Sequence, residues 1–306
     1  MGFGDMLNRY FSKEEIKSWT SLRKSGYILL PLFIYFLVHD LAEILLWAGV
    51  NQLMVKGSTG MVAFLTNNAY TVQGIVNGLM ILIGVAAIGK AVKSEILETE
   101  GRESYGRGEK GDNKSTKADK PVRLSEKKIT AYIMVAVLAF ASALGLNILF
   151  YLLEITEGSD AYTRAANAQY GVDFFTGLFL YGIVSPFAEE AVFRGVMYNR
   201  MKRCFNVQAA LFESALLFGC YHGNIVQAIY GTLLGILIAY IYEKYESFAA
   251  PVLFHAVANV SIYALTYHNS LSDISRGAGA IMVAVLTAAM VSSLIYIQRK
   301  VKSKEL

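Results

Sequence analysis

Apolar residues in this chain gather in long uninterrupted blocks, instead of alternating with polar residues or marking one face of a helix. A block of about 18 or more apolar residues is long enough to cross the hydrocarbon core of a bilayer as a helix. Blocks of about this length occupy residues 27–50, 70–92, 129–153, 173–198, 207–223, 225–242, 249–267 and 278–297. We therefore expect an all-α, polytopic bundle of about eight transmembrane helices.

The polar intervals between these blocks predict how the chain is organised. An N-terminal segment (1–26) precedes two accessory helices (27–92), and the main bundle (129–297) is followed by a basic tail (298–306). The interval 93–128 is rich in Gly, Lys, Glu and Ser and has little apolar surface to bury. That composition is typical of a disordered loop.

The placement of Lys and Arg predicts the orientation, because cytoplasmic loops of membrane proteins carry an excess of these residues. If both termini are cytoplasmic, all of the 28 Lys and Arg except Lys56, Arg164 and Arg276 lie in cytoplasmic segments or at cytoplasmic helix ends. We therefore expect a multi-pass protein of the cell membrane with cytoplasmic N- and C-termini. Topology accounts for the basic loop, so the expected partner is the lipid bilayer and not nucleic acid.

Charged residues make up only 17% of the chain, so ionisable groups inside the apolar blocks are conspicuous. Each costs several kcal/mol in a bilayer unless it is paired or faces a wet cavity, which makes it a functional candidate. The candidates are concentrated in three blocks: Glu189, Glu190 and Arg194 in the fourth, His222 at the end of the fifth, and His255 and Asn259 in the seventh.

Helical spacing predicts how these side chains are directed. Glu190 and Arg194 are four residues apart and therefore face each other as an ion pair. Glu189 is rotated by about 100° around the helix and is left for another partner or for chemistry. His255 and Asn259 share a face for the same reason. We expect these polar groups to converge on one site, the alternative being a purely structural polar network.

Three sequence motifs resemble those of a known family. EEAVFR (189–194), FGCYH (218–222) and HAVAN (255–259) are similar to the Glu-Glu-x-x-x-Arg, Phe-x-x-x-His and His-x-x-x-Asn motifs of the CAAX-processing and bacteriocin-self-immunity (CPBP, or Abi) membrane proteases, which include the type II CAAX prenyl endopeptidases. The motifs occur in the family's order on separate apolar blocks. The resemblance covers about residues 173–265 and implies that this part is a protease core.

By this resemblance the catalytic set is Glu189, His222, His255 and Asn259. Structural support would come from Glu190, Arg194 and Phe218. The implied activity is that of an intramembrane endopeptidase acting on membrane-associated or lipidated proteins or peptides. The natural substrate, its prenylation and the oligomeric state are left open by the sequence.

Two versions of the chemistry agree with these residues. In a metal-free version, Glu189 and His222 activate water while His255 and Asn259 stabilise the oxyanion. In a metal version, Glu189, His222 and His255 hold Zn²⁺. We favour the version without a cofactor, because the chain has no His-Glu-x-x-His motif and the ligands are spread over three helices. Counting residues from the helix ends predicts a site in the inner half of the bilayer, reachable from the cytoplasm.

Two other functions remain as alternatives. A non-enzymatic immunity or scaffold protein of the same family would use the polar site only for binding, and a proton-coupled small transporter would use the buried Glu and His as a relay. Ser185 lies four residues before Glu189, but Ser-Pro-Phe lacks the glycine-flanked nucleophile of serine-type intramembrane proteases. In the first block, His39, Asp40 and Glu43 are interpreted as a locally paired cluster, with a proton relay or a second metal site as the alternative.

Overall fold

The computed structural model describes residues 13–105, 126–270 and 274–301, and every regular element within these ranges is a helix. The first part of the chain forms α2 (Lys13–Ser18), α3 (Ser21–Lys56), α4 (Thr59–Asn67), α5 (Ala69–Ala87) and α6 (Gly89–Tyr105). The second part begins with α7 (Glu126–Leu152) and α8 (Asp160–Tyr170) and ends with α12 (Val207–Cys220), α13 (Ile225–Tyr245), α14 (Ala249–Tyr267) and α15 (Arg276–Lys300).

One long helical segment between α8 and α12 is not a uniform α-helix. It consists of α9 (Phe174–Phe179), the π-helix η1 (Leu180–Val184), α10 (Ser185–Glu190), the π-helix η2 (Ala191–Tyr198) and α11 (Asn199–Cys204). It is bent by 113° relative to α8. All residues from Ala188 to Met201 are buried, so this segment forms the centre of the bundle.

The predicted all-α polytopic bundle is confirmed. Six helices in the described part of the chain are long and apolar enough to cross a membrane, and the bent segment formed by α8 and α9–α11 brings the number to seven. The eighth apolar segment is α12, with 14 residues. At about 1.5 Å per residue it reaches about 21 Å, less than the roughly 30 Å of a hydrocarbon core. A count of eight full spans therefore stays a prediction.

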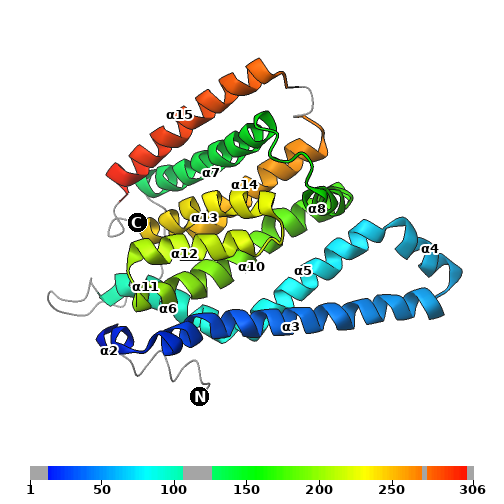
Figure 1. The fold of residues 1–306 in the computed structure, drawn as a ribbon, viewed down its shortest axis with the longest axis horizontal. Coiled ribbons are helices and arrows are strands. Elements are labelled where there is room, and N and C mark those ends of the chain that lie inside the picture. Colours follow the sequence, from blue (N-terminus) through cyan, green and yellow to red (C-terminus); the bar gives the residue numbers. More distant parts are fainter. Residues whose placement is uncertain (1–12, 106–125, 271–273, 302–306) are drawn as a thin grey trace, which may run out of the picture.

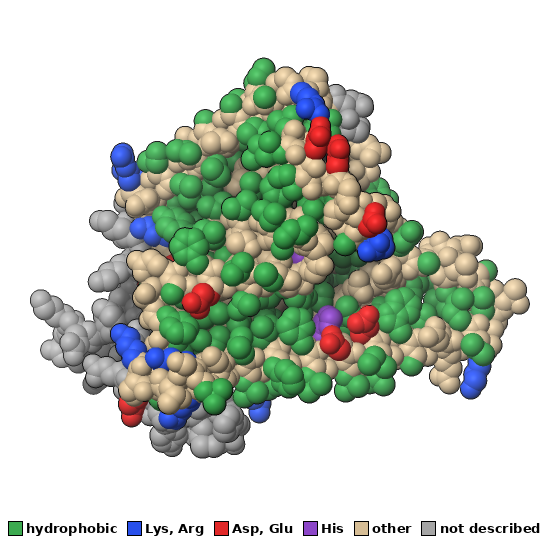
Figure 2. All heavy atoms as spheres, viewed as in Figure 1, with side chains coloured by type: hydrophobic (Ala, Val, Ile, Leu, Met, Phe, Trp, Pro, Cys, Tyr) green, Lys and Arg blue, Asp and Glu red, His purple; other side chains and the backbone are tan. Residues whose placement is uncertain are grey.

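The helices lie roughly antiparallel to one another, so their connections gather at two ends of the molecule (Figure 1). One end holds the α11–α12 and α13–α14 connections and the last residues of α15; the other holds α4, α8 and the α14–α15 connection. Lys and Arg side chains gather mainly at the first end (Figure 2). We call the first the basic end and the second the far end. This separation is the one that the positive-inside pattern predicts, and the cytoplasmic location of the basic end follows from it as a prediction.

Part of the interval 93–128, for which the composition predicts a disordered loop, is helical in the structure. Residues 93–105 continue α6, α7 already begins at Glu126, and residues 106–125 lie outside the described part. The physical reason for the longer α6 is a set of ion pairs with α11. Glu95 Oε1 lies 3.0 Å from Arg200 Nε, and Arg203 Nη2 lies 2.6 Å from both Glu95 and Glu98.

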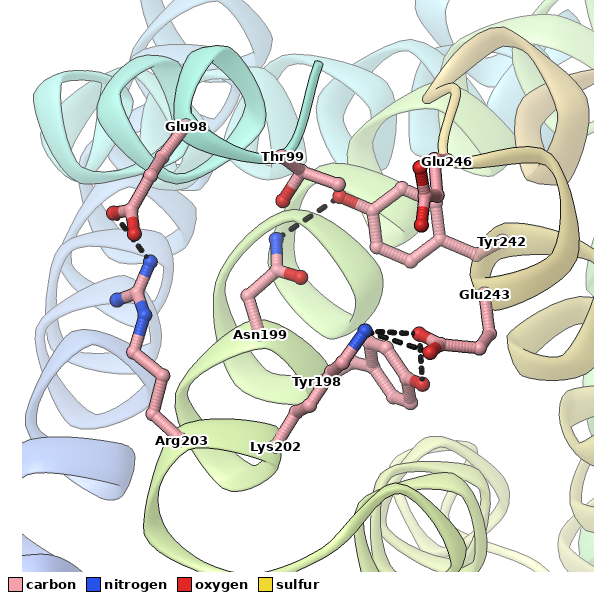
Figure 3. A pocket seen from close by; sticks show the side chains of 9 residues that line it. All are labelled: Glu98, Thr99, Tyr198, Asn199, Lys202, Arg203, Tyr242, Glu243 and Glu246. Atoms are coloured by element: carbon pink, nitrogen blue, oxygen red, sulfur yellow. Dashed lines mark hydrogen bonds and ion pairs between the residues drawn. The ribbon is translucent and has the colours of Figure 1, made fainter. Parts of the chain in front are cut away.

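A second polar network closes the bundle at the basic end (Figure 3). Lys202 Nζ and the Tyr198 hydroxyl both contact the carboxylate of Glu243 on α13, at 2.5 and 2.8 Å. Asn199 Nδ2 donates to the Tyr242 hydroxyl at 2.9 Å. These contacts tie α6, α11 and α13 together around a space of only about 50 Å³.

Small residues let α12 and α13 pack closely. A Cβ atom added to Gly235 would lie 3.2 Å from Ala215, and one added to Gly231 would lie 3.3 Å from the Cα of Gly219. Such close backbone approach is the usual reason for small residues at helix interfaces in membranes. It fixes the position of the α12 C-terminus, which carries His222.

Candidate active site

The residues of the three motifs meet at one cavity of about 400 Å³ inside the bundle. Its walls come from α7, α8, the η1–α10 segment, α13 and α14, and from the turn that follows α12. Glu189, His222, His255 and Asn259 all line it, together with Ser185. The convergence that helical spacing predicts is therefore found in the structure.

Glu190 and Arg194 form the ion pair expected from their spacing. Arg194 Nη1 lies 3.0 Å from Glu190 Oε1, and both side chains are fully buried. Arg194 Nη2 also donates to the carbonyl of Gly235 on α13 at 2.9 Å. The guanidinium lies 4.6 Å from the ring centroid of Phe218, which adds a cation–π contact. Through its contacts with Glu190, Gly235 and Phe218, Arg194 therefore connects α10 and η2 with α13 and α12.

His255 lies between two carboxylates. Its Nδ1 is 2.8 Å from Glu190 Oε1, and its Nε2 is 3.7 Å from Glu189 Oε2. Because a carboxylate only accepts hydrogen bonds, Nδ1 carries a proton. Glu190 thus fixes the ring of His255 so that its second nitrogen is directed at Glu189.

Glu189 has a partner that sequence reasoning missed. Its Oε1 accepts a short hydrogen bond from the hydroxyl of Ser185, one turn earlier on the same helix face. The signal in the sequence is the i, i+4 spacing of Ser185 and Glu189, which places both side chains on one helix face. The hydroxyl orients the carboxylate without neutralising its charge.

His222 is oriented by its own helix. Its Nδ1 lies 3.0 Å from the carbonyl oxygen of Phe218, so Nδ1 carries the proton and Nε2 keeps its lone pair in the neutral ring. The Phe218 ring packs edge-on against both His222 and His255, with centroid distances of 5.1 and 5.4 Å. Phe218 therefore holds the two imidazoles apart.

A π-helix positions Asn259. In η1 the N–H of Ser185 donates to the carbonyl of Leu180. In this i to i−5 register, the backbone carbonyl of Tyr181 would accept from the N–H of residue 186. Residue 186 is a proline and has no N–H. The free carbonyl of Tyr181 accepts instead from Asn259 Nδ2 at 2.9 Å. Single π-helical turns of this kind are frequent at functional sites.

The metal version is not supported by the arrangement of donors. In the described residues, no group of three His, Cys, Asp or Glu side chains is placed to hold a metal ion. His222 and His255 do each direct Nδ1 to an oxygen, as metal-bound histidines usually do, but Glu189, His222 and His255 do not close around one point.

Of the cluster in α3, His39 and Asp40 are paired locally, which agrees with that part of the first interpretation. His39 Nδ1 lies 2.9 Å from Asp40 Oδ1. The His39 ring packs against Tyr35, whose hydroxyl lies 3.3 Å from the Tyr221 hydroxyl. Neither His39 nor Asp40 lines the cavity that contains Glu189.

A comparison with protein families finds a match that covers the three motifs. Residues 171–261 match the family described as type II CAAX prenyl endopeptidase Rce1-like. The match covers just under a third of the chain, includes all three motifs, and confirms the resemblance that they carry. No curated protein and no solved structure matched the chain. The chain is thus a multi-pass membrane protein whose central part is similar to a family of membrane proteases.

Proposed function

We propose that this protein is an intramembrane endopeptidase of the cell membrane that hydrolyses peptide bonds of membrane-associated substrates without a metal. The observation that carries the proposal is the carboxylate of Glu189, which pairs with no Lys or Arg among the described residues and lies at a cavity with His222, His255 and Asn259. The match of residues 171–261 to a protease family supports the same reaction class.

The residues can be assigned to the steps of hydrolysis. Glu189 takes one proton from a water molecule whose oxygen attacks the carbonyl carbon of the substrate, and the lone pair of His222 Nε2 accepts a hydrogen bond from the O–H that remains on that oxygen. The developing oxyanion receives a hydrogen bond from the second N–H of Asn259 Nδ2. Because Nδ1–H of His255 is already donated to Glu190, His255 Nε2 donates to the oxyanion only when the ring carries both protons. Glu189 then returns its proton to the amide nitrogen as the C–N bond breaks, which leaves a carboxylic acid and an amine.

The rest of the site keeps these groups in position. Glu190 and Arg194 hold the ring of His255, and Ser185 holds the carboxylate of Glu189. Because fixed donors in a site of low dielectric need no reorganisation during the reaction, this support contributes to the rate.

Cleavage of a panel of internally quenched peptides by the purified protein in detergent tests the proposal. We expect the wild type to cleave, the His222→Ala variant to lose about 10²- to 10⁴-fold in rate, and a strong chelator to have no effect. His268→Ala is the matched control, because His268 is exposed beyond the end of α14 and should leave the rate unchanged.

Two results would contradict this proposal in different ways. Equal cleavage by the wild type and His222→Ala would assign the activity to another site or to a contaminant. Loss of cleavage with chelator and its recovery with Zn²⁺ would replace the metal-free mechanism by the metal version. If no peptide of the panel is cleaved by the wild type, the endopeptidase proposal fails in favour of a binding function.

The Ser185→Ala variant tests the support of Glu189. We expect kcat to fall about tenfold, corresponding to the loss of one hydrogen bond to a charged group, while KM changes less than twofold. The fall arises because the carboxylate loses the partner that fixes its rotamer. Kinetics of Ser185→Ala and Ser185→Thr measure the effect; a Thr variant as slow as the Ala variant would argue against a role of the hydroxyl.

A further inference from the structure

Helix α14, which carries His255 and Asn259, begins without a cap from its own sequence. Its N-cap residue is Phe248, whose side chain cannot accept a hydrogen bond. In a capping box, a Glu or Gln three residues after the N-cap reaches back to the backbone N–H of the N-cap residue. In α14 that position is Pro251. The backbone N–H of Phe248 therefore needs a partner from another part of the chain.

Helix α6 supplies this partner. Glu100 Oε1 accepts a hydrogen bond from the backbone N–H of Phe248 at 3.1 Å, across 148 residues of the chain. A carboxylate at a helix N-terminus also interacts favourably with the positive end of the helix dipole. The end of α6 lies beside the α13–α14 connection, because Thr99 and Glu246 line the same small space (Figure 3). Glu100 therefore caps the helix that carries His255.

The same helix is anchored to the segment that carries the carboxylates of the site. Glu95 of α6 is fully buried and lies 3.0 Å from Arg200 of α11. Next to it, Ile96 packs against η2, where a Cβ atom added to Gly195 would lie 3.4 Å from the Ile96 side chain. The segment η2–α11 continues directly from α10, which carries Glu189. Helix α6 thus contacts both parts of the candidate active site from outside the cavity.

The geometry of the site depends on the relative position of these two parts. His255 Nδ1 is 2.8 Å from Glu190, whereas its Nε2 is 3.7 Å from Glu189, which is longer than a hydrogen bond. His255 lies less than two turns from the start of α14, so a shift of the helix start is carried to its ring. A misplacement of about 1 Å at a reacting group can cost about 10²-fold in rate.

We propose that Glu100 is a positioning residue for the hydrolysis, an inference that rests on the proposed protease function. By capping α14, Glu100 holds His255 and Asn259 in register with Glu189, on the segment to which α6 is anchored through Glu95. Glu100 is exposed and does not line the cavity. It therefore acts through α14 and not on the substrate.

Kinetics of two Glu100 variants test this role. Glu100→Ala removes the acceptor, and we expect kcat for the quenched peptides to fall about tenfold while KM changes less than twofold. Glu100→Gln keeps an oxygen that accepts from the Phe248 N–H, so its kcat should be at least half that of the wild type. Lys93→Ala is the matched control, because Lys93 is an exposed residue of the same helix, and its kcat should be unchanged.

Hydrogen exchange of backbone amides measures the cap independently of activity. In Glu100→Ala we expect the segment 248–255 to exchange about tenfold faster than in the wild type, because the start of α14 opens locally. Helices α7 and α15 should exchange at unchanged rates. The unfolding temperature in the same detergent should change by less than about 4 °C, which separates a local effect on α14 from a general loss of structure.

Several outcomes would overturn the positioning role. One is a Glu100→Ala variant whose kcat stays within twofold of the wild type, and another is a Glu100→Gln variant as slow as Glu100→Ala. Faster exchange throughout the bundle with a lower unfolding temperature would assign Glu100 a general structural role instead.

Failure of the cap and failure of the protease function are distinguishable. Cleavage by the wild type with unchanged exchange at 248–255 in Glu100→Ala would retain the protease and refute the cap. If the wild type cleaves no peptide, the positioning role falls with the protease function, whereas faster exchange confined to this segment would still identify Glu100 as the cap of α14.

Discussion

The Glu189→Gln variant is expected to lose about 10³-fold in kcat or more, while its unfolding temperature stays close to that of the wild type. Gln has nearly the same shape as Glu, so it fills the same space and its amide oxygen still accepts from Ser185. What it lacks is the ability to take up a proton. Removal of a general base costs about 10²- to 10⁴-fold, and here the same group also delivers the proton to the leaving nitrogen.

Steady-state cleavage of the best peptide and thermal unfolding in the same detergent measure the two quantities. Glu213→Gln is the matched control, because Glu213 is an exposed glutamate of α12 and does not line the cavity; its kcat should be unchanged. A Glu189→Gln variant that keeps more than a tenth of the wild-type kcat would show that Glu189 is not the base.

Arg194→Met should give the largest loss of stability among single substitutions at the site. It leaves the carboxylate of Glu190 fully buried without its cation and leaves the Gly235 carbonyl without its donor. Breaking a buried ion pair by removing one partner costs about 3–5 kcal/mol. At roughly 2–4 °C per kcal/mol for a chain of 150–250 residues, the unfolding temperature should fall by about 10 °C.

Two further variants show whether the buried charge is the cause. Glu190→Gln combined with Arg194→Met should recover much of the loss, because no unpaired charge then remains in the interior. Arg276→Met is the control, because it removes an ion pair with Glu154 that is largely exposed. Such pairs contribute about 0–1 kcal/mol, so the unfolding temperature should change little. If the double variant is as unstable as Arg194→Met alone, packing against Phe218 and not the charge dominates.

Rules that depend only on neighbouring residues were sufficient to predict the spanning helices and the side-chain pairs within them. Apolar block length predicted the spanning helices because transfer into lipid depends on composition over about 20 residues. The constant pitch of a helix predicted the contact between Glu190 and Arg194, found at 3.0 Å. The same rule applies to Ser185 and Glu189, which are also four residues apart and form a hydrogen bond.

Local rules failed where distant segments determine the structure. The composition of residues 93–128 predicted a loop, but α6 continues to Tyr105, and its residues Glu95 and Glu98 pair with arginines of α11. Counting residues along separate helices does not show that His222 and His255 meet. The structure brings both to one cavity, because α12 is short and packs through Gly219 and Gly231 against α13.

The sequence alone therefore determined the helical bundle, the gathering of its basic residues at one end, and the motif residues that are proposed to carry the chemistry. These follow from hydropathy, from charge and from helical periodicity, all of which act over a few turns. Only the tertiary structure decided which nitrogen of His255 is directed at Glu189, that the carbonyl of Tyr181 is free for Asn259, and that the cavity extends toward α8. These depend on the tilt and relative shift of helices far apart in the chain, which are fixed by contacts between side chains and not by the composition of any one segment.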